Sequence, residues 1–346
     1  MEAIAPPDEA ARGAARERWN RCAKPLGSLG LLEAAVEQIA ALTGSAAVDL
    51  SEKAVLVFCA DNGVVAQGVS QTDSSVTAAV ARQLALGRTS VSRMAAVAHC
   101  RVVPVDMGIL DFEGCDGVLD RRVGNGTADF TLGPAMSREQ AEQAILTGVE
   151  LARQEAERGT RLLAAGEMGI GNTTTASAIT STLLSLPASE VTGRGAGLSD
   201  DGLACKLTAI RRGLLVNQPD KSDPVDLLAK VGGFDLAGMC GLFLGGAVYR
   251  VPVLIDGFIS AVAALCACRL CPAASAAILA GHVSAEKAGR LVLDAMRKKP
   301  LITAELRLGE GTGAVAAMPL LDMALSVYHE AYTFEEGGIE PYTPQC

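Results

Sequence analysis

The sequence predicts an α/β fold with an open, six-stranded parallel sheet, helices on both faces and a small additional helical domain. Six short apolar runs of strand length are separated by longer stretches with helical periodicity, which is the order of β-α-β units. Most of the short runs are nearly continuous in Val, Ile, Leu and Ala, as in parallel strands that are buried on both faces. The first fifty residues differ, because they contain two helical segments with no strand between them.

The N-terminal helices are expected at residues 8–22 and 31–42, on either side of the segment Lys-Pro-Leu-Gly-Ser-Leu-Gly at 24–30. Proline and glycine in that segment interrupt the helical period. We expect residues 1–50 to form a small helical subdomain, which the C-terminal helix can complete. Residues 51–346 are then the α/β domain.

The strands and helices of the α/β domain alternate along the rest of the chain. Predicted strands lie at 54–60, 101–105, 161–166, 251–255, 276–281 and 304–309. Predicted helices lie at 77–97, 138–158, 202–217, 235–249 and 315–332. Residues 111–131 show neither a helical nor a strand period, and we interpret them as an irregular connection.

The apolar run at 251–270 is long enough to resemble a membrane span. Asp256 and Gly257 lie inside it and Arg269 is near its end, and a charge at that depth is costly in lipid. A buried strand followed by a buried helix accounts for the run at lower cost. We therefore expect no membrane partner from this segment.

Net charge narrows the range of partners. The chain carries 39 acidic and 30 basic residues, a formal charge of −9. This sign argues against a nucleic acid or an anionic membrane as partner. Small anions remain compatible, because backbone amides bind them locally.

The ten cysteines are scattered, and most stand in apolar runs such as Phe58-Cys59-Ala60. Residues 1–7 lack the basic segment and apolar run of a signal peptide, so we expect a cytoplasmic protein with reduced cysteines. Cys266, Cys268 and Cys271 cluster, but they lack a second ligand pair and lie in a helical stretch. We expect neither a metal nor a cofactor, and a role of this cluster beyond packing stays open.

Charged side chains follow the predicted strands. They are Asp61, Asp106, Glu167, Asp256, His282 and Glu310. Ligands of open parallel sheets bind beyond the carboxyl ends of the strands, where these side chains would meet. Acids at these positions also cap the helices that follow. We expect at least three of the six to line one site.

The segment Gly-Glu-Met-Gly-Ile-Gly-Asn-Thr-Thr at 166–174 follows a strand and opens a helix. Its glycines allow close approach of a ligand, and the amides of a helix start suit a phosphate. It lacks the Gly-Lys-Ser/Thr of a Walker loop, and Thr174 replaces the third glycine of a dinucleotide fingerprint. A single phosphate is therefore favoured over a pyrophosphate, with a plain strand–helix turn as the alternative.

Two further glycine-rich segments stand out. The segment at 192–198 could clamp a phosphate or ribose, with Arg194 and Lys206 as cations, or be a solvated loop. The segment at 308–314 places Glu310 between Gly309 and Gly311, where its own packing does not account for it. We interpret Glu310 as a general base.

These segments together resemble the nicotinate-nucleotide–dimethylbenzimidazole phosphoribosyltransferase family over nearly the whole chain. The matching segments are 24–30, 60–64, 67–70, 76–77, 105–108, 126–127, 166–173, 256–260, 281–282 and 308–313. The resemblance implies a Rossmann-like catalytic domain at 51–346, a small helical domain, a homodimer and no metal.

The resemblance also implies the roles of individual residues. Glu310 corresponds to the base of the family, and whether Glu167 shares that role stays open. The expected nucleotide and phosphate contacts are Glu167, Gly169, Gly171, Asn172, Thr173, Gly195, Lys206, Asp256, Ser284, Gly311, Thr312 and Gly313. The expected base pocket contains Ser75, Gln83 and Leu308. Ala79 and Gln83 stand where the family often carries Gln and Asn, so the identity of the accepted base stays open.

The implied reaction moves the 5-phosphoribosyl group of nicotinate mononucleotide to 5,6-dimethylbenzimidazole or a related base. The products are the α-ribotide, α-ribazole 5′-phosphate, and nicotinate, for assembly of the nucleotide loop of cobalamin or another cobamide. Benzimidazoles, adenine and phenolic compounds all remain candidate acceptors. Two other functions stay open: an NAD-dependent oxidoreductase on the same fold, and a non-catalytic nucleotide-binding module.

Overall fold

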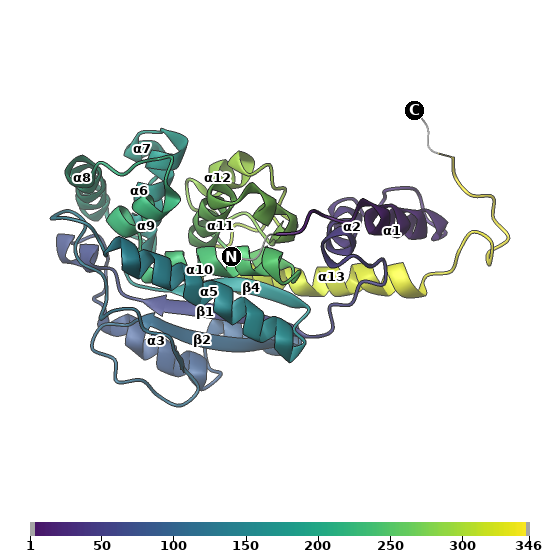
Figure 1. Ribbon diagram of the computed structural model, residues 1–346, viewed down its shortest axis with the longest axis horizontal. Coiled ribbons are helices and arrows are strands. Elements are labelled where there is room, and N and C mark those ends of the chain that lie inside the picture. The colour runs from purple at the N-terminus through teal and green to yellow at the C-terminus, as the bar shows by residue number, and fades with distance from the viewer. Residues whose placement is uncertain (1–3, 344–346) are drawn as a thin grey trace.

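The computed structural model describes residues 4–343 and is built around a six-stranded, all-parallel sheet (Figure 1). The strands are β1 Lys53–Ala60, β2 Cys100–Gly108, β3 Leu119–Asp120, β4 Leu162–Met168, β5 Val253–Ile255 and β6 Ile278–Ala280. Their order in the sheet is β3-β2-β1-β4-β5-β6. This is the Rossmann order, in which the chain reverses direction of travel between β1 and β4. The predicted fold class is confirmed.

One predicted strand is wrong. Residues 304–309 form no strand; an isolated parallel bridge joins His282 to Ile302, and the chain then turns at Glu305, whose φ is 54°. The sixth strand is instead β3, inside the stretch 111–131 that the sequence predicts to be irregular. Two residues are too short for a strand period, and β3 exists because Leu119 pairs with Val105 at the edge of the sheet.

The helices follow the predicted pattern with one exception. The predicted helix 77–97 is two helices, α3 Ser75–Ala85 and α4 Ser90–Val97. Gly87 between them has a φ of 67°, and the Thr89 side chain caps α4 by accepting a hydrogen bond from the Ser92 amide. A glycine turn followed by a cap therefore interrupts a continuous apolar period.

The other predicted helices are present. They are α1 Glu9–Arg21, α2 Leu31–Thr43, α5 Arg138–Arg158, α8 Asp200–Asn217, α10 Phe234–Val248 and α13 Thr312–Glu330. The remaining helices are α6 Asn172–Leu184, α7 Ala188–Val191, α9 Pro224–Val231, α11 Phe258–Leu270 and α12 Gly289–Ala295, with 3-10 turns η1 Gly63–Gln67 and η2 Pro272–Ala277.

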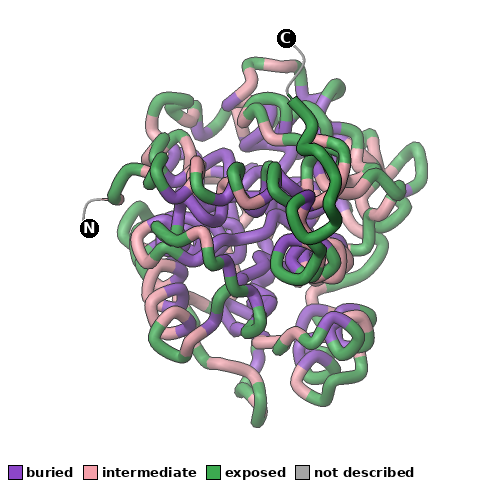
Figure 2. Tube along the Cα trace, turned by 90° about the vertical axis from the view of Figure 1, so that its right-hand side faces the viewer, coloured by how far each residue is buried: buried purple, intermediate pink, exposed green. Residues whose placement is uncertain are grey.

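Two hydrophobic cores lie on the two faces of the sheet, and β1 contributes to both. All eight of its residues are buried, and alternate side chains belong to different cores. Leu56 and Phe58 pack with residues of α5, α10 and α11, whereas Val55 and Val57 pack with α2 and α13. Figure 2 shows the resulting buried centre beneath an exposed outer layer. Burial on both faces explains why the strand sequence is apolar throughout.

Helices α1 and α2 pack against each other and against the second half of α13 (Figure 1). The Trp19 and Tyr328 rings meet with centroids 4.8 Å apart, and both side chains are buried. This cluster is continuous with the core on the α13 face of the sheet. The expected domain limits at residues 1 and 346 lie outside the described residues.

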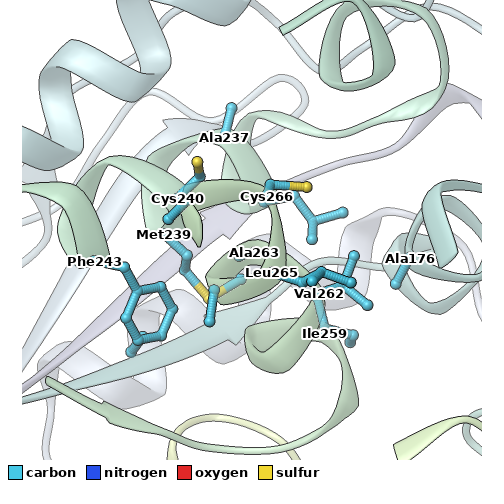
Figure 3. Close-up of a cluster of buried hydrophobic side chains, with 14 of the residues drawn as sticks. Ala176, Ala237, Met239, Cys240, Phe243, Ile259, Val262, Ala263, Leu265 and Cys266 are labelled. Carbon is cyan, nitrogen blue, oxygen red and sulfur yellow. The ribbon is translucent and has the colours of Figure 1, made fainter. Parts of the chain in front are cut away.

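The apolar run 251–270 forms β5 and the buried helix α11, as predicted. Figure 3 shows Cys266 of α11 and Cys240 of α10 among apolar side chains such as Met239 and Val262. Burial raises the pKa of Cys266 to about 12, so its thiol is neutral. Within residues 4–343 no helix is both long and apolar enough to span a membrane, and no group of three or more His, Cys, Asp and Glu side chains is arranged to hold a metal.

The contact between α5 and α10 depends on glycines. A Cβ on Gly148 would lie 1.9 Å from the Gly238 carbonyl oxygen, whereas a Cβ on Gly13 in α1 would meet nothing within 4 Å. We expect Gly148→Ala to lower the free energy of unfolding by about 1–3 kcal/mol, because the helices must separate. Gly13→Ala should raise it by about 0.5–1 kcal/mol through helix propensity. Denaturant titration of both variants tests this, and equal effects would contradict it.

Candidate active site

A cavity of about 270 Å³ opens beyond the carboxyl ends of β4, β5 and β6. Its walls come from residues 167–173, 257–260, 282–286 and 307–310, with additions from 69–71 and 194–198. Glu167, His282 and Glu310 line it together, so the structure brings three of the six strand-end residues to one place. Glu310 arrives there from an irregular segment and not from a strand.

Asp61 and Asp106 serve local structure. Asp61 accepts hydrogen bonds from the Thr77 hydroxyl at 2.6 Å and the Leu110 amide at 2.9 Å, and it lies beside a second hollow. Asp106 accepts from the amides of the turn that follows β2 and pairs with Arg122 at 2.8 Å. Both carboxylates therefore hold loops.

Asp256 is a third strand-end carboxylate that binds backbone amides. Its carboxylate accepts hydrogen bonds from the amides of Gly311 at 3.0 Å, Gly313 at 2.7 Å and Ala314 at 3.2 Å. It is 1% exposed, faces the start of α13 and does not line the cavity, and its expected contact with a nucleotide stays a prediction. Free amides and the positive end of the α13 dipole attract the carboxylate to this position.

Glu310 occupies a constrained backbone. Its φ of 61° is left-handed, as are those of Gly309 and Gly311 at 92°. The Glu310 amide donates to the Glu167 carbonyl oxygen at 3.2 Å, and a Cβ on Gly166 would lie 2.6 Å from the Glu310 carbonyl oxygen. A non-glycine residue in this conformation persists only where its surroundings hold it, here β4 and the Asp256 carboxylate. Burial raises the pKa of Glu310 above its ordinary value.

Glu167 lies at the end of β4 and is 8% exposed. Its Oε2 accepts a hydrogen bond from the Asn172 side-chain amide, which also donates to Asp235 Oδ2 at 3.0 Å. Burial, and then the negative charge of Asp235, raise the pKa of Glu167 to about 8. Glu167 is therefore largely neutral at pH 7.

Asp235 is a site residue that the sequence does not single out. It lies in the first turn of α10 and is fully buried. An acidic residue at a helix start is ordinary, so the only available signal was its place at the head of an otherwise apolar helix. Its position beside Asn172 depends on the packing of α10 against the loop after β4.

The glycine-rich loop at 169–173 forms one wall of the cavity. Gly171 has a φ of 94°, and a Cβ there would lie 2.9 Å from Val65 Cγ2. A Cβ on Gly169 would lie 2.3 Å from the Ala60 carbonyl oxygen. The glycines let this loop pack directly on the segment that follows β1, and α6 begins at Asn172 immediately after it.

Lys206 of α8 is a buried cation beside this loop. Its Nζ donates to the Thr173 hydroxyl at 2.7 Å, and its side chain is 1% exposed. Burial lowers its pKa to about 8. A Cβ on Gly195 would lie 2.9 Å from the Thr173 Oγ1 atom, so the 194–198 segment closes over the same corner. A desolvated ammonium beside a helix start is suited to an anion.

The remaining predicted residues divide into two groups. Ser284 and Leu308 line the cavity, and Leu308 is 55% exposed. Gly311, Thr312 and Gly313 are buried at the start of α13. Ser75 lies in the second hollow and Gln83 is exposed on α3, so within residues 4–343 the chain does not bring them into the cavity.

Comparisons with known proteins identify the family. A family model described as phosphoribosyltransferase, DBI_PRT, matches residues 4–339. The chain is 43% identical over 330 residues to the nicotinate-nucleotide–dimethylbenzimidazole phosphoribosyltransferase of Acetivibrio thermocellus, covering 95% of this chain and 94% of that protein. The chain belongs to this family. The corresponding enzyme of Chloroflexus aggregans is 44% identical over 337 residues, with 97% and 96% covered.

Solved structures agree with the family assignment. The crystal structure of CobT from Thermus thermophilus matches with a TM-score of 0.90 at 39% identity, covering 96% of this chain and all of that one. Family membership confirms the resemblance and the enzyme class, a phosphoribosyltransferase of cobamide lower-ligand synthesis. It decides against the oxidoreductase and the non-catalytic module.

The contacts of Asp256 generate a prediction. We expect Asp256→Asn to lower kcat about 10- to 100-fold, because Glu310 loses its anchor and displacements near ~1 Å can cost ~10²-fold. The KM for the nucleotide should stay close to that of the wild type. Steady-state kinetics with nicotinate mononucleotide and dimethylbenzimidazole provide the measurement.

The control for this prediction is Asp106→Asn. Asp106 is also a buried strand-end carboxylate that accepts backbone amides, but it lies away from the cavity. Both variants should lose about 1–3 kcal/mol of stability from an impaired buried acceptor. Only Asp256→Asn should lose turnover. A raised nucleotide KM with an unchanged kcat would instead return Asp256 to the nucleotide site.

Proposed function

We propose that this enzyme transfers the 5-phosphoribosyl group of nicotinate mononucleotide to 5,6-dimethylbenzimidazole or a related base. The observation that carries this proposal is a single cavity with two kinds of wall. One is a corner formed by Thr173 and Gly195, with the buried Lys206 ammonium bonded to the Thr173 hydroxyl, and the other carries the carboxyl groups of Glu167 and Glu310. The substrates named for the relatives supply the same pair, an anionic nucleotide and an imidazole-type base.

Glu310 is the base in this proposal. Its carboxylate takes the proton from the imidazole N–H, and a ring nitrogen forms a bond to C1′ as the bond from C1′ to the nicotinate nitrogen breaks. The electron pair of the broken bond neutralises the pyridinium, so nicotinate leaves without protonation. Attack on the face opposite to nicotinate converts the β-nucleotide into the α-ribotide. Positioning supplies much of the acceleration, because the leaving group is already activated.

The 5′-phosphate is assigned to the loop at 169–173. Lys206 supplies the positive charge, and Thr173 holds its ammonium in place at 2.7 Å. Asn172 begins α6, so the dipole of that helix also favours an anion here. Ser284 on the opposite side of the cavity is assigned to the same nucleotide.

The proposed assembly is a cytoplasmic homodimer. Large apolar side chains are exposed on the surface of the described residues, including Leu86 at 59% and Val97 at 77%. Their burial in a second copy would remove apolar surface from water. Eight cysteines lie in or against the two hydrophobic cores, as reduced thiols commonly do, and Cys205 is exposed.

Light scattering tests the oligomeric state. We expect a mass of twice the 35.5 kDa chain at micromolar concentration. Replacement of Val97 by Asp should lower that mass toward the monomer, because a charge would be buried in the contact. The matched replacement at Leu215, exposed on α8, should leave it unchanged. A monomer mass for the wild type would refute the dimer.

The proposed base gives a prediction about rate and pH. Glu310→Gln keeps the size of the side chain but cannot accept a proton, so kcat should fall about 10²- to 10⁴-fold with the nucleotide KM retained. The wild-type rate should fall as the pH drops through the raised pKa of Glu310, because protonation removes the base. The variant should lack this acid limb.

Glu305→Gln is the control for Glu310→Gln. Glu305 is exposed on the same loop and lies outside the cavity, so its replacement should leave both kcat and the pH profile intact. Glu167 would be the base, and not Glu310, if Glu167→Gln abolished turnover while Glu310→Gln kept a near-normal kcat.

The proposed phosphate site gives a prediction about nucleotide affinity. Lys206→Met should raise the nucleotide KM about 10- to 100-fold, since a charge-assisted hydrogen bond contributes about 1.5–3 kcal/mol. In the wild type, KM should rise as the pH increases through about 8, where the free enzyme loses the Lys206 charge. Measurement of KM against pH should show this rise in the wild type and not in the variant.

Lys298→Met is the matched control, because Lys298 is a partly buried lysine whose pKa desolvation also lowers to about 8. Its Nζ donates to the Ser275 carbonyl oxygen at 2.8 Å, away from the cavity. Its loss should leave the nucleotide KM unchanged. Equal effects of the two substitutions would remove Lys206 from the phosphate site.

A further inference from the structure

Glu167, Asn172 and Asp235 form a buried chain that leads from the cavity into the core. One side-chain amide, that of Asn172, donates to carboxyl oxygens of both acids. Asp235 is fully buried, and its other oxygen accepts the Leu236 amide at 2.9 Å. No ion pair is found for Asp235 within residues 4–343. A buried acid that lacks a cation is costly to ionise, and such groups gather at functional sites.

A second observation concerns Asn62, at the end of β1. Its Oδ1 atom is buried and accepts no hydrogen bond from the described residues. A Cβ on Gly233 would lie 2.5 Å from this oxygen and 2.4 Å from Asp235 Oδ1. Both oxygens therefore flank Gly233, so an unpaired acceptor lies on the Oδ1 side of Asp235. The surroundings of this acid are short of positive charge and of donors.

We propose that Asp235 is a positioning residue of the active site, which holds the Glu167 carboxyl through Asn172 and keeps it in its neutral, hydrogen-bond-donating form. Glu167 Oε1 lies toward Gly309, where a Cβ would be 2.6 Å away, and Glu167 lines the cavity. A neutral Glu167 then presents an O–H donor to the cavity that Glu310 also lines. The inference rests on the proposed function for the use of this donor, but not for its existence.

Burial raises the pKa values of both acids, and the charges that add to this effect are negative. Asp235, Asp256 and Glu310 raise the pKa of Glu167, and Asp61 raises that of Asp235. His282 Nδ1 lies 3.9 Å from Asp256 Oδ1 and acts on Asp256, and the cations Arg194 and Arg307 line the cavity that Glu167 also lines. Two close carboxyl groups in a dry site favour a single shared negative charge over two. Removal of the Asp235 charge should therefore let Glu167 ionise at lower pH.

The test combines a spectroscopic readout with kinetics on the full-length enzyme. Infrared difference titration follows the C=O stretch of protonated carboxyl groups, and Glu167→Gln identifies the band of Glu167. In Asp235→Asn the midpoint of that band should move to lower pH by about 1–3 units. The control Asp106→Asn removes a buried carboxylate elsewhere and should leave the midpoint unchanged.

The kinetic arm uses kcat at saturating nucleotide, which excludes the effect of Lys206 on binding. The wild-type kcat should fall as the pH rises through the Glu167 midpoint, and this alkaline limb should move to lower pH in Asp235→Asn. An unchanged midpoint and limb would make Asp235 merely structural and overturn the inference. A shifted midpoint in a protein without transferase activity toward any base would overturn the proposed function alone.

Asn172→Ala supplies a second variant, in case Asp235→Asn fails to fold. It removes the bridging amide and keeps the Asp235 charge. We expect a fall in kcat, because Glu167 loses its orientation, while the midpoint of the Glu167 band stays above the ordinary range of Glu. Normal kcat in this variant would contradict the positioning role.

Discussion

The hydrogen bonds from the start of α13 to the Asp256 carboxylate connect the main parts of this enzyme. Asp256 follows β5, at the centre of one half of the sheet, and the amides that it accepts belong to the residues directly after Glu310. The opposite half of α13 packs against α2, where Tyr328 meets Trp19. One buried carboxyl group therefore fixes the backbone that carries the proposed base, and the helix α13 joins that backbone to the N-terminal helices. Loss of this contact would free the Glu310 backbone and the start of α13. The left-handed backbone conformation of Glu310 is unfavourable for a residue with a side chain, so its surroundings must hold it.

Carboxyl groups in the cavity would repel an anionic substrate. The substrate of the relatives is an anionic nucleotide, and the cavity is lined by three carboxyl groups, Glu167, Glu286 and Glu310, with Asp256 close behind Glu310. The protein relieves the repulsion in two ways. It desolvates Glu167, so that this acid is largely neutral at pH 7, and it concentrates the cationic charge of Lys206 beside the start of α6. The same burial that neutralises the acid weakens the lysine, whose pKa falls to about 8. The site is thus balanced for work near neutral pH, where Lys206 is charged and Glu167 retains its proton.

Sequence patterns predicted the elements whose signal is local and periodic. The sequence predicted the strands β1, β2, β4, β5 and β6 and the helix at 138–158. A strand that is buried on both faces is apolar throughout, and a helix that is buried along one side has apolar residues at a regular spacing. Failures came where tertiary pairing decides the outcome. Two residues of β3 form a strand only because β2 lies beside them, and residues 304–309 had the pattern of a strand without a partner to pair with.

In the site, glycine-flanked Glu310 and the 169–173 loop could be found from spacing alone. The roles of Asp256 and Asp235 could not, since each depends on which backbone amide or side chain the fold brings opposite to it. The division of the chain at residue 50 stays a prediction.

The topology explains why this Rossmann order accommodates a mononucleotide. In dinucleotide-binding folds of this order the ligand crosses the switch point between β1 and β4. Here the segment after β1 fills that position with protein: Gly171 packs against Val65 and Asn62, and the Gly63 amide is tied to the Thr127 hydroxyl at 3.1 Å. The cavity is therefore displaced to the β4-β5-β6 half of the sheet, with the second hollow separated from it on the β1 side. The two hollows share no lining residue, and the proposed ribose phosphate site lies between the 169–173 loop and Glu310.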